Sequence, residues 1–536
     1  MNLADKIGVL LEWCYANGLE IDKRLSLRGD EQGGIAVFSG EASIPAGETA
    51  VTIPKTSALS TRSCSLSQFI TPALAGPEAQ LALSTALYTE ILLDSSSKWY
   101  GYLLSFPETI DLPLCWKPCI EGIGRPSYVT SEELRDMEDA LSWLKGTEAE
   151  KILRANTQSG LSFNRLHSYF ESVVLPLVST HMPGYDVDLD KFIRAYCLIS
   201  SRAFLVDSFH GLAMVPIADA FNHIQENHVH LESDYNVCPE CGSLDECSHD
   251  REGGDHATEV TTASLATSGH VYDCYEMVTN TAIPPFGEVY NTYGETLSNA
   301  ELLCQYGFVL EANENDALTW MVDEVLDAAG ISLKSRRASI IQRCSEYLKE
   351  FDFDDTQCLI QNTDPKKHRQ YSINADGQAS IQLWILLVTI STQKATADAR
   401  GMLPLLHELQ IALEHQSGGS ESDSESEDNI ACDSAGDHDS MVGALVRSIG
   451  DGCFGILEST YRLLVELCRV RKGSIGKGVQ GADDLWDVLA TLGTHQRRTR
   501  SALLLAMNER LILSSCEATW QDLLGVLERS RTSSRN

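Results

Sequence analysis

Residues 285–308 decide the fold, and they read PFGEVYNTYGETLSNAELLCQYGF. Five aromatic residues occur in this short stretch, among them Tyr293 and the Tyr306-Gly307-Phe308 run. A row of aromatic residues at the ends of helices and strands belongs to a hydrophobic core more often than to a binding site. The stretch therefore has to be interpreted together with the segments that precede it in the chain.

A second segment supplies polar groups suited to a charged ligand. It begins with Ser201-Arg202-Ala203-Phe204 and continues at residues 215–223, which read VPIADAFNH. The Arg202 guanidinium can donate two parallel hydrogen bonds to a carboxylate. Asn222 offers both a donor and an acceptor, and His223 can donate to a nucleoside or stack near it. The alternative is that Asn222 and His223 only hold a buried turn.

A third segment lies near the start of the chain. Residues 33–38 read GGIAVF and residues 49–53 read TAVTI, and the turn-forming sequence IPAGE separates these two β-prone runs. We expect paired short strands here. The Gly pair by itself indicates only a turn, since glycine gives the backbone freedom in many unrelated loops.

Taken together, and in their order along the chain, the three segments resemble the SET-domain class typified by the plant Rubisco large-subunit methyltransferase. This class includes ribosomal lysine methyltransferases. The resemblance covers about residues 1–312 and implies an α+β fold: a SET domain of short curved β-sheets whose ends form a pseudoknot. The helical pattern at about 65–200 would be an insertion in that domain. Helical periodicity dominates from about 313 to 536, and the resemblance implies that this part is a mostly α-helical C-terminal substrate-binding lobe.

The resemblance also implies a cofactor and a set of site residues. The cofactor would be S-adenosyl-L-methionine, with Tyr293 as the essential catalytic residue and Phe308 against the adenine ring. The residues implied to bind the cofactor are Gly33, Ile35, Arg202, Asp219, Asn222, His223, Tyr306 and Phe308.

The implied reaction is transfer of a methyl group to the side-chain amine of lysine in a protein substrate. The amine must be neutral, because an ammonium has no lone pair, and a narrow apolar channel favours the neutral form by desolvation. Tyr293 would then orient the lone pair, and we assign no general base. Two alternatives remain open: a protein-histidine methyltransferase, and a catalytically weak SET-type protein-binding module.

Residues 225–257 form an insertion that this class does not generally need, and it contains a cysteine and histidine cluster. Cys238, Cys241, Cys247 and His249 have the spacing of a tetrahedral zinc site, and Pro239 and Gly242 permit the tight turns that such a site requires. We expect a structural zinc ion. Free thiols in a flexible loop and redox chemistry are the alternatives. Three further histidines could replace one of the ligands: His228, His230 and His256.

Composition limits the partners of the chain. Its 41 Lys and Arg against 76 Asp and Glu give a net charge of -35, which repels nucleic-acid phosphates and favours basic proteins. We expect a basic protein substrate, with a ribosomal protein favoured, and no direct contact with nucleic acid. The same acidity could serve solubility alone.

The remaining expectations concern location and disorder. The start of the chain lacks the pattern of a secretory signal, and residues 381–388 are too short a run to span a bilayer and predict a buried helix. We therefore expect a cytoplasmic or nuclear monomer that does not enter a membrane. Residues 416–440 are rich in Ser and acids, and we expect a disordered acidic loop that interrupts the helical lobe.

Overall fold

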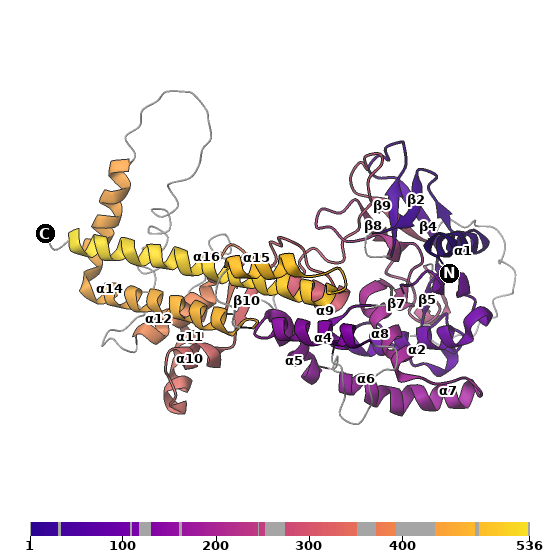
Figure 1. Cartoon of the computed structure of the whole chain (residues 1–536), viewed down its shortest axis with the longest axis horizontal. Helices are drawn as coiled ribbons and strands as arrows, with labels where there is room; N and C mark the ends of the chain where they lie inside the picture. The colour runs from indigo at the N-terminus through magenta and orange to yellow at the C-terminus, as the bar shows by residue number, and fades with distance from the viewer. Residues whose placement is uncertain are drawn as a thin grey trace. The chain divides into compact units, whose positions relative to one another are not determined.

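The structure is a computed structural model, shown in Figure 1. It describes residues 2–30, 34–107, 110–116, 130–159, 163–244, 246–251, 274–350, 371–392, 435–477 and 482–533. The chain divides into two compact units. The first unit comprises Met1–Tyr128, Leu153–Leu297 and Leu303–Gly307, and the second comprises Val129–Ile152, Ser298–Leu302 and Phe308–Asn536.

The first unit is built on three small antiparallel sheets. They have the strand orders β1-β4-β9-β8, β2-β3 and β5-β7-β6. The strands are β1 (Glu20–Ile21), β2 (Leu25–Gly29), β3 (Ile35–Ser39), β4 (Thr49–Pro54), β5 (Leu59–Ser60), β6 (Ala203–Asp207), β7 (Gly211–Met214), β8 (Val229–Glu232) and β9 (Cys274–Thr279). The expected strands at 33–38 and 49–53 correspond to β3 and β4, but they are not partners: β3 pairs with β2, and β4 pairs with β1 and β9.

Helices occupy the chain between β5 and β6, as the sequence predicts. The helices of the first unit are α1 (Leu3–Ala16), α2 (Gly76–Leu93), α3 (Tyr100–Leu103), α6 (Phe163–Tyr169), α7 (Leu175–His181) and α8 (Leu189–Arg202), with short turns η1 (Lys55–Ser57), η2 (Ser67–Phe69), η3 (Asp94–Ser96), η4 (Pro113–Cys115), η5 (Phe170–Val174), η6 (Ala218–Ala220) and η7 (Ser248–Arg251). Helix α2 is buried on nearly all sides and packs against α8. A helix that is apolar all round belongs inside a core, so α2 is part of the core of this unit and lies beside α8 (Figure 1).

The extended segment at 283–291 joins parts of the first unit that are far apart in the sequence. Ile283 pairs with Ile44, and Glu288 pairs with Phe38 beside β3. Farther along, Asn291 forms a parallel bridge with His223. These bridges bring the three segments of the resemblance into one place.

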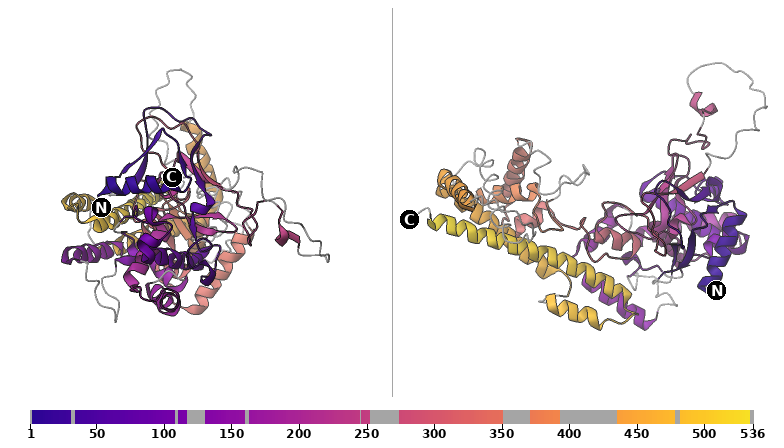
Figure 2. Two further views of the ribbon diagram at one scale, coloured as in Figure 1. Left: turned by 90° about the vertical axis from the view of Figure 1, so that its right-hand side faces the viewer. Right: turned by 90° about the horizontal axis from the view of Figure 1, so that it is seen from above.

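The second unit is mostly helical. Its elements are α4 (Ser131–Leu144), the start of α5 (Glu148–Ser159), the start of α9 (Asn299–Tyr306), β10 (Ala317–Trp320), α10 (Val322–Ala328), α11 (Lys334–Glu350), β11 (Tyr371–Asn374), α12 (Ile381–Thr392), α14 (Ala435–Ser474), α15 (Ala482–Thr491) and α16 (Arg497–Ser533). The long helices α14 and α16 run side by side (Figures 1 and 2). The apolar run at 381–388 is the buried helix that the sequence predicts, because every residue of α12 is buried.

The boundaries differ from the sequence prediction at two places. Val129–Ile152 lies within the expected insertion at 65–200 but belongs to the second unit, because α4 packs along α16. The expected boundary at 312 also lies a few residues late, since the second unit resumes at Phe308.

Two expected loop regions also contain regular structure. Helix α14 begins at Ala435, so the expected disordered loop at 416–440 is wrong in its last residues, and its residues 416–434 lie outside the described part. Strand β8 lies inside the expected insertion at 225–257, paired with β9. The second half of that insertion, from residue 252 on, is also outside the described part.

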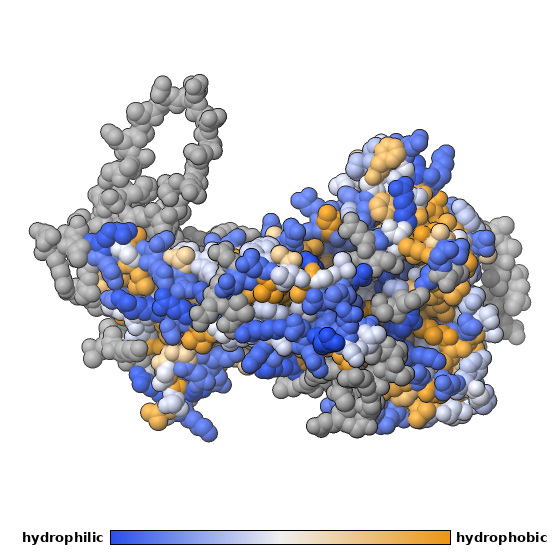
Figure 3. All heavy atoms as spheres, viewed as in Figure 1, coloured by the Kyte–Doolittle hydropathy of each residue, from blue (hydrophilic) through white to orange (hydrophobic). Residues whose placement is uncertain are grey.

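The surface carries hydrophobic and hydrophilic residues side by side on the face shown in Figure 3. None of the helices in the described ranges is long and apolar enough to cross a membrane.

Candidate active site

Tyr293 lies between two other aromatic rings in the first unit. Its ring centroid is 5.2 Å from that of His223 and 4.6 Å from that of Tyr306, with which it stacks. The backbone of Tyr293 is held as well: its N–H donates to His223 Nδ1 at 3.0 Å, and its carbonyl accepts from the Tyr306 hydroxyl at 3.4 Å. Residues from two segments of the resemblance therefore fix the position of the predicted catalytic tyrosine.

Burial shifts the pKa of all three groups in the same chemical sense. It raises the pKa of the Tyr293 and Tyr306 hydroxyls and lowers the pKa of the His223 imidazole. Each shift favours the neutral form of the side chain, which is the effect of a surrounding of low polarity. The immediate surroundings of these three side chains are therefore of low polarity.

The Asn222 side chain is oriented by an acid that the sequence analysis did not identify. Asn222 Nδ2 donates to Glu288 Oε1 at 2.7 Å, and the Tyr290 hydroxyl donates to Glu288 Oε2 at 3.1 Å. With its amide nitrogen on Glu288, Asn222 presents its amide oxygen as an acceptor, which suits an ammonium group. Glu288 and Tyr290 lie two positions apart in an extended segment and so share a face, but no local pattern connects that face with Asn222.

Arg202 and Asp219 form a partly buried polar group with a tyrosine from α3. Arg202 Nη1 donates to the Asp219 carbonyl at 2.9 Å and lies 3.5 Å from Asp219 Oδ2. The Tyr102 hydroxyl donates to the same Oδ2 at 2.9 Å. Burial raises the pKa of Asp219, although Arg202 opposes the shift. Tyr102 is another residue that the sequence analysis did not assign to the site, because it lies in the helical insertion, 117 positions from Asp219.

The segment before Asp219 adopts an unusual backbone. Ile217 has a φ of 70° and is 1% exposed. The left-handed region is strained for a β-branched residue, at a cost of order 1–3 kcal/mol, and such residues concentrate at functional sites. The packing around residues 215–223 therefore keeps Ile217 at a positive φ, which a β-branched residue disfavours.

The remaining predicted cofactor residues are only partly described. Ile35 is the first residue of β3 and is buried. Gly33 lies outside the described residues, but Gly34 follows it, and a Cβ on Gly34 would stand 2.6 Å from Asp30 Oδ2. Phe308 belongs to the second unit.

The residues that do come together fit an amino-acid-bearing ligand. Arg202 supplies a guanidinium, which matches a carboxylate, and Asn222 supplies an acceptor for an ammonium group. His223 and Tyr306 add aromatic faces beside Tyr293. S-adenosylmethionine has a carboxylate, an ammonium group and an aromatic base, so this donor set suits it.

The four predicted metal ligands also come together, on the connection between β8 and β9. The ligand atoms of Cys238, Cys241, Cys247 and His249 all lie within 4.8 Å of one another. The other histidines have different contacts: His228 Nδ1 accepts from the Tyr290 N–H, and His230 contacts Glu232. His256 lies outside the described residues.

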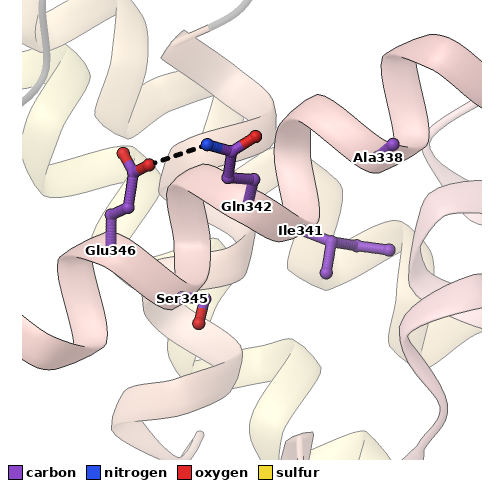
Figure 4. Close-up of a pocket in the computed structure, with 5 residues that line it drawn as sticks. All are labelled: Ala338, Ile341, Gln342, Ser345 and Glu346. Carbon is purple, nitrogen blue, oxygen red and sulfur yellow. Dashed lines mark hydrogen bonds between the residues drawn. The ribbon is translucent and has the colours of Figure 1, made fainter.

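A surface hollow on α11 is a weaker candidate for chemistry. It is lined by five residues of that one helix: Ala338, Ile341, Gln342, Ser345 and Glu346 (Figure 4). Gln342 Nε2 donates to Glu346 Oε1 at 3.0 Å. One helix face with a single acid provides no set of converging groups, so we place the active site around Tyr293.

Comparison with known proteins finds relatives that are lysine methyltransferases. No family model matches the chain. The ribosomal lysine N-methyltransferase 3 of Saccharomyces cerevisiae is 26% identical over 355 residues, which cover 56% of this chain and 61% of that protein. The human N-lysine methyltransferase SETD6 is 22% identical over 381 residues, which cover 63% of this chain and 67% of that protein. The chain thus spans about three fifths of the length of the yeast relative.

Solved structures agree on the fold. The SET domain of LSMT bound to lysine and AdoHcy superposes with a TM-score of 0.56 at 15% identity, covering 99% of this chain and 94% of that one. Rubisco LSMT bound to AdoMet gives a TM-score of 0.55 at 16% identity, with 98% and 93% covered. The expected α+β architecture of small antiparallel sheets and helices is confirmed. The chain therefore has the fold of the SET-domain structures of Rubisco LSMT.

Proposed function

We propose that this chain transfers a methyl group from S-adenosylmethionine to the side-chain amine of lysine in a protein substrate. The observation that carries the proposal is the position of Tyr293 between the rings of His223 and Tyr306, where burial also shifts the pKa of all three groups towards the neutral form. A lysine amine that enters the same surroundings loses charge for the same reason. The neutral amine has the lone pair that methyl transfer needs.

The residues have separate roles in this proposal. The cofactor, when bound, supplies an electrophilic methyl group on a positively charged sulfur. Arg202, Asn222 and His223 bind its amino-acid and nucleoside parts, and Asp219 holds Arg202 in place through the contact at 3.5 Å. Gly33, Ile35, Tyr306 and Phe308 complete the set of cofactor residues that we propose.

Tyr293 is the proposed catalytic residue. Its backbone and ring contacts with His223 and Tyr306 leave it little freedom, so its hydroxyl has one preferred position. A fixed acceptor and donor beside the amine orients the lone pair, and orientation of this kind supplies a large part of the rate in a displacement. Because the pKa of this hydroxyl is raised, Tyr293 stays protonated at neutral pH and does not act as a base.

The proposed substrate is a basic protein, with a ribosomal protein favoured. The net charge of -35 supports this choice, because it attracts a basic partner. The name of the yeast relative, a ribosomal lysine N-methyltransferase, points in the same direction. Such a substrate would place the protein in the cytoplasm or the nucleus.

The test is incubation of the purified chain with methyl-labelled S-adenosylmethionine and unmethylated ribosomal proteins, followed by mass mapping of the labelled band. We expect label on a lysine, at a rate that is about 10²–10³-fold lower with the Tyr293→Phe variant. Label on histidine would show that the acceptor is histidine and not lysine. Cofactor binding without any labelled protein, over a range of basic proteins, would leave a binding module and overturn the enzyme.

A further inference from the structure

We propose that Cys238, Cys241, Cys247 and His249 bind a structural zinc ion that fastens the β8–β9 connection to the β6–β7 hairpin. The site lies outside the proposed methyl-transfer chemistry and does not depend on it. Three thiols and one imidazole form a donor set that is typical of structural zinc. With four protein ligands the coordination shell is closed, so the metal has no position for a substrate.

The distances agree with tetrahedral coordination. Zinc binds sulfur at about 2.3 Å and nitrogen at about 2.0 Å, so neighbouring ligand atoms in a tetrahedral site lie about 3.5 to 3.8 Å apart. The distance from His249 Nδ1 to Cys238 Sγ is 3.8 Å, and to Cys247 Sγ it is 3.6 Å. The greatest separation within the cluster is 4.8 Å. The ligands therefore need only small movements to enclose one ion.

The first two cysteines lie on a tight turn that is already formed. The Cys238 N–H donates to the Ser243 carbonyl at 2.8 Å, and the Gly242 N–H donates to the Cys238 carbonyl at 2.8 Å. Gly242 has a φ of 73°, which favours glycine. A Cβ at this position would also stand 3.0 Å from the Phe209 ring. The turn thus places Cys238 and Cys241 together and needs glycine to do so.

Polar contacts connect this turn with the β6–β7 hairpin. The Ser208 N–H donates to the Tyr235 carbonyl at 3.0 Å, and Ser208 Oγ donates to the Val237 carbonyl at 2.5 Å. Arg62 donates to the Pro239 carbonyl at 3.1 Å and lies over the Phe209 ring. These contacts all lie within the first unit, so the cluster is held against a defined surface.

The connection has too little apolar burial to stay in place by itself. Among its described residues from 233 to 251, the buried hydrophobic ones are Val237 and Cys238, while Tyr235 and Leu244 are 47% and 46% exposed. Segments without a sufficient core usually depend on a metal or a disulfide. The three cysteines of the cluster form no disulfide, and a metal would use all three of them where a disulfide would leave one over.

The location predicts what the metal does. β6 follows Arg202 directly, and β7 leads into Val215 and the Asn222-His223 pair. An ion that fastens the hairpin between these strands stabilises both arms of the proposed cofactor site. We expect loss of the metal to lower the melting temperature of the protein and to weaken cofactor binding several-fold, without changing which residue is methylated.

The test measures metal content in the full chain, purified without chelators. We expect one zinc per chain by elemental analysis, and cobalt in its place should give the visible absorption of a tetrahedral thiolate site. The Cys241→Ser variant should lose the metal, whereas Cys274→Ser, which changes a cysteine outside the cluster, should keep it. The His249→Cys variant should also keep it, because thiolate replaces imidazole in such sites.

A second measurement covers the case in which Cys241→Ser fails to fold. In the wild-type protein the cluster thiols should resist alkylation until a strong chelator is added, and should then react together. Wild-type protein that contains no zinc after growth and purification in zinc-supplemented medium, with cluster thiols that react at the same rate with and without chelator, would overturn the proposal. Neither readout depends on methyl transfer, so failure of one proposal is distinguishable from failure of the other.

Discussion

At the scale of single residues, Tyr293 is the most informative position. The Tyr293→Phe change removes the hydroxyl and keeps the ring that stacks on Tyr306. We expect methyl transfer to fall by about 10²–10³-fold, the usual loss when a fixed transition-state contact is removed. Cofactor affinity, measured by calorimetry, should stay within about twofold.

Tyr306→Phe is the matched control for that variant. It removes a hydroxyl in the same stack, but one whose contact is with the Tyr293 carbonyl at 3.4 Å. A hydrogen bond of this length is weak and contributes little to the position of Tyr293. We therefore expect the rate of methyl transfer to fall by about tenfold or less. A Tyr293→Phe protein with wild-type turnover would exclude Tyr293 from catalysis.

Asp207 gives a pH-dependent prediction for the first unit. Burial alone would raise the pKa of Asp207, but hydrogen bonds from His210 and from Tyr275 Oη at 2.8 Å lower it from 3.8 to about 2. Because the pKa is lower in the folded state, the stabilisation is complete above pH 3.8 and is lost as the pH falls towards 2. The ionised carboxylate should contribute about 2 kcal/mol to the free energy of unfolding at neutral pH.

The variant Asp207→Asn checks this by urea denaturation at several pH values. It should be less stable than the wild type at pH 7, and the difference should narrow below pH 3.8. Asp234→Asn, which changes an exposed carboxylate of the same unit, should have little effect. A stability difference that is the same at pH 7 and at low pH would contradict the assignment.

Single residues also mark the limit of what the sequence could predict. Tyr293, His223, Asn222 and Arg202 were predicted from motifs. The structure places Tyr293 against His223 and Arg202 beside Asp219. Glu288, however, acts through Asn222, which is 66 positions away in the chain. Contacts over such separations are set by the path of the backbone, which local patterns do not encode.

At the scale of elements, α16 depends on an acid from another helix. Asp136 of α4 accepts from the Thr499 N–H at 3.0 Å and the Thr499 hydroxyl at 2.7 Å, in the first turn of α16. This is an N-cap supplied from outside the helix, and Asp136 is 2% exposed. The Asp136→Ala change leaves buried donors without an acceptor, which costs about 2–3 kcal/mol.

Thermal unfolding followed by the helical circular dichroism signal measures that loss. Asp139→Ala is the control on the same helix, because Asp139 forms an exposed ion pair with Lys477 that contributes at most about 1 kcal/mol. The two variants should differ by several degrees in melting temperature. Equal melting temperatures would show that the contact with Thr499 does not anchor α16.

Local sequence signals predicted where helices and strands occur better than which other elements they pack against. The Thr130-Glu133 pair predicts a helix start, and the structure has the complete capping box there. The buried helix at 381–388 was also predicted from its apolar run. In contrast, the assignment of α4 to the second unit follows from its packing on α16, more than 350 residues away, and no local pattern indicates it. Strand β8 was missed although its four residues, Val229–Glu232, alternate between apolar and polar, because four residues are the shortest run in which alternation can be read.

At the scale of the whole molecule, the acidic charge should govern encounters with the substrate. A charge of -35 attracts a basic protein at long range. Dissolved salt screens this attraction and so weakens it. We expect the KM for a basic protein substrate to rise several-fold between about 50 and 300 mM salt, with kcat nearly constant, since ionic strength acts on association more than on a buried reaction.

A short uncharged peptide substrate is the control for that experiment, because its KM should change little with salt. Steady-state kinetics at four or five ionic strengths are sufficient. A KM for the basic protein that is independent of salt would remove the main support for a basic partner.

Because the chain passes several times between the two units, truncation or cleavage affects both of them. The chain passes from one unit to the other after Tyr128, Ile152, Leu297, Leu302 and Gly307. A stop codon after Gly307 would therefore retain α4 but remove α16, and expose the buried Leu134, Trp143 and Leu144. Exposed apolar residues of this kind promote aggregation and degradation. A single proteolytic cut likewise releases neither unit complete, because each unit contains several separate segments. We therefore expect truncated or cut chains to be degraded entirely.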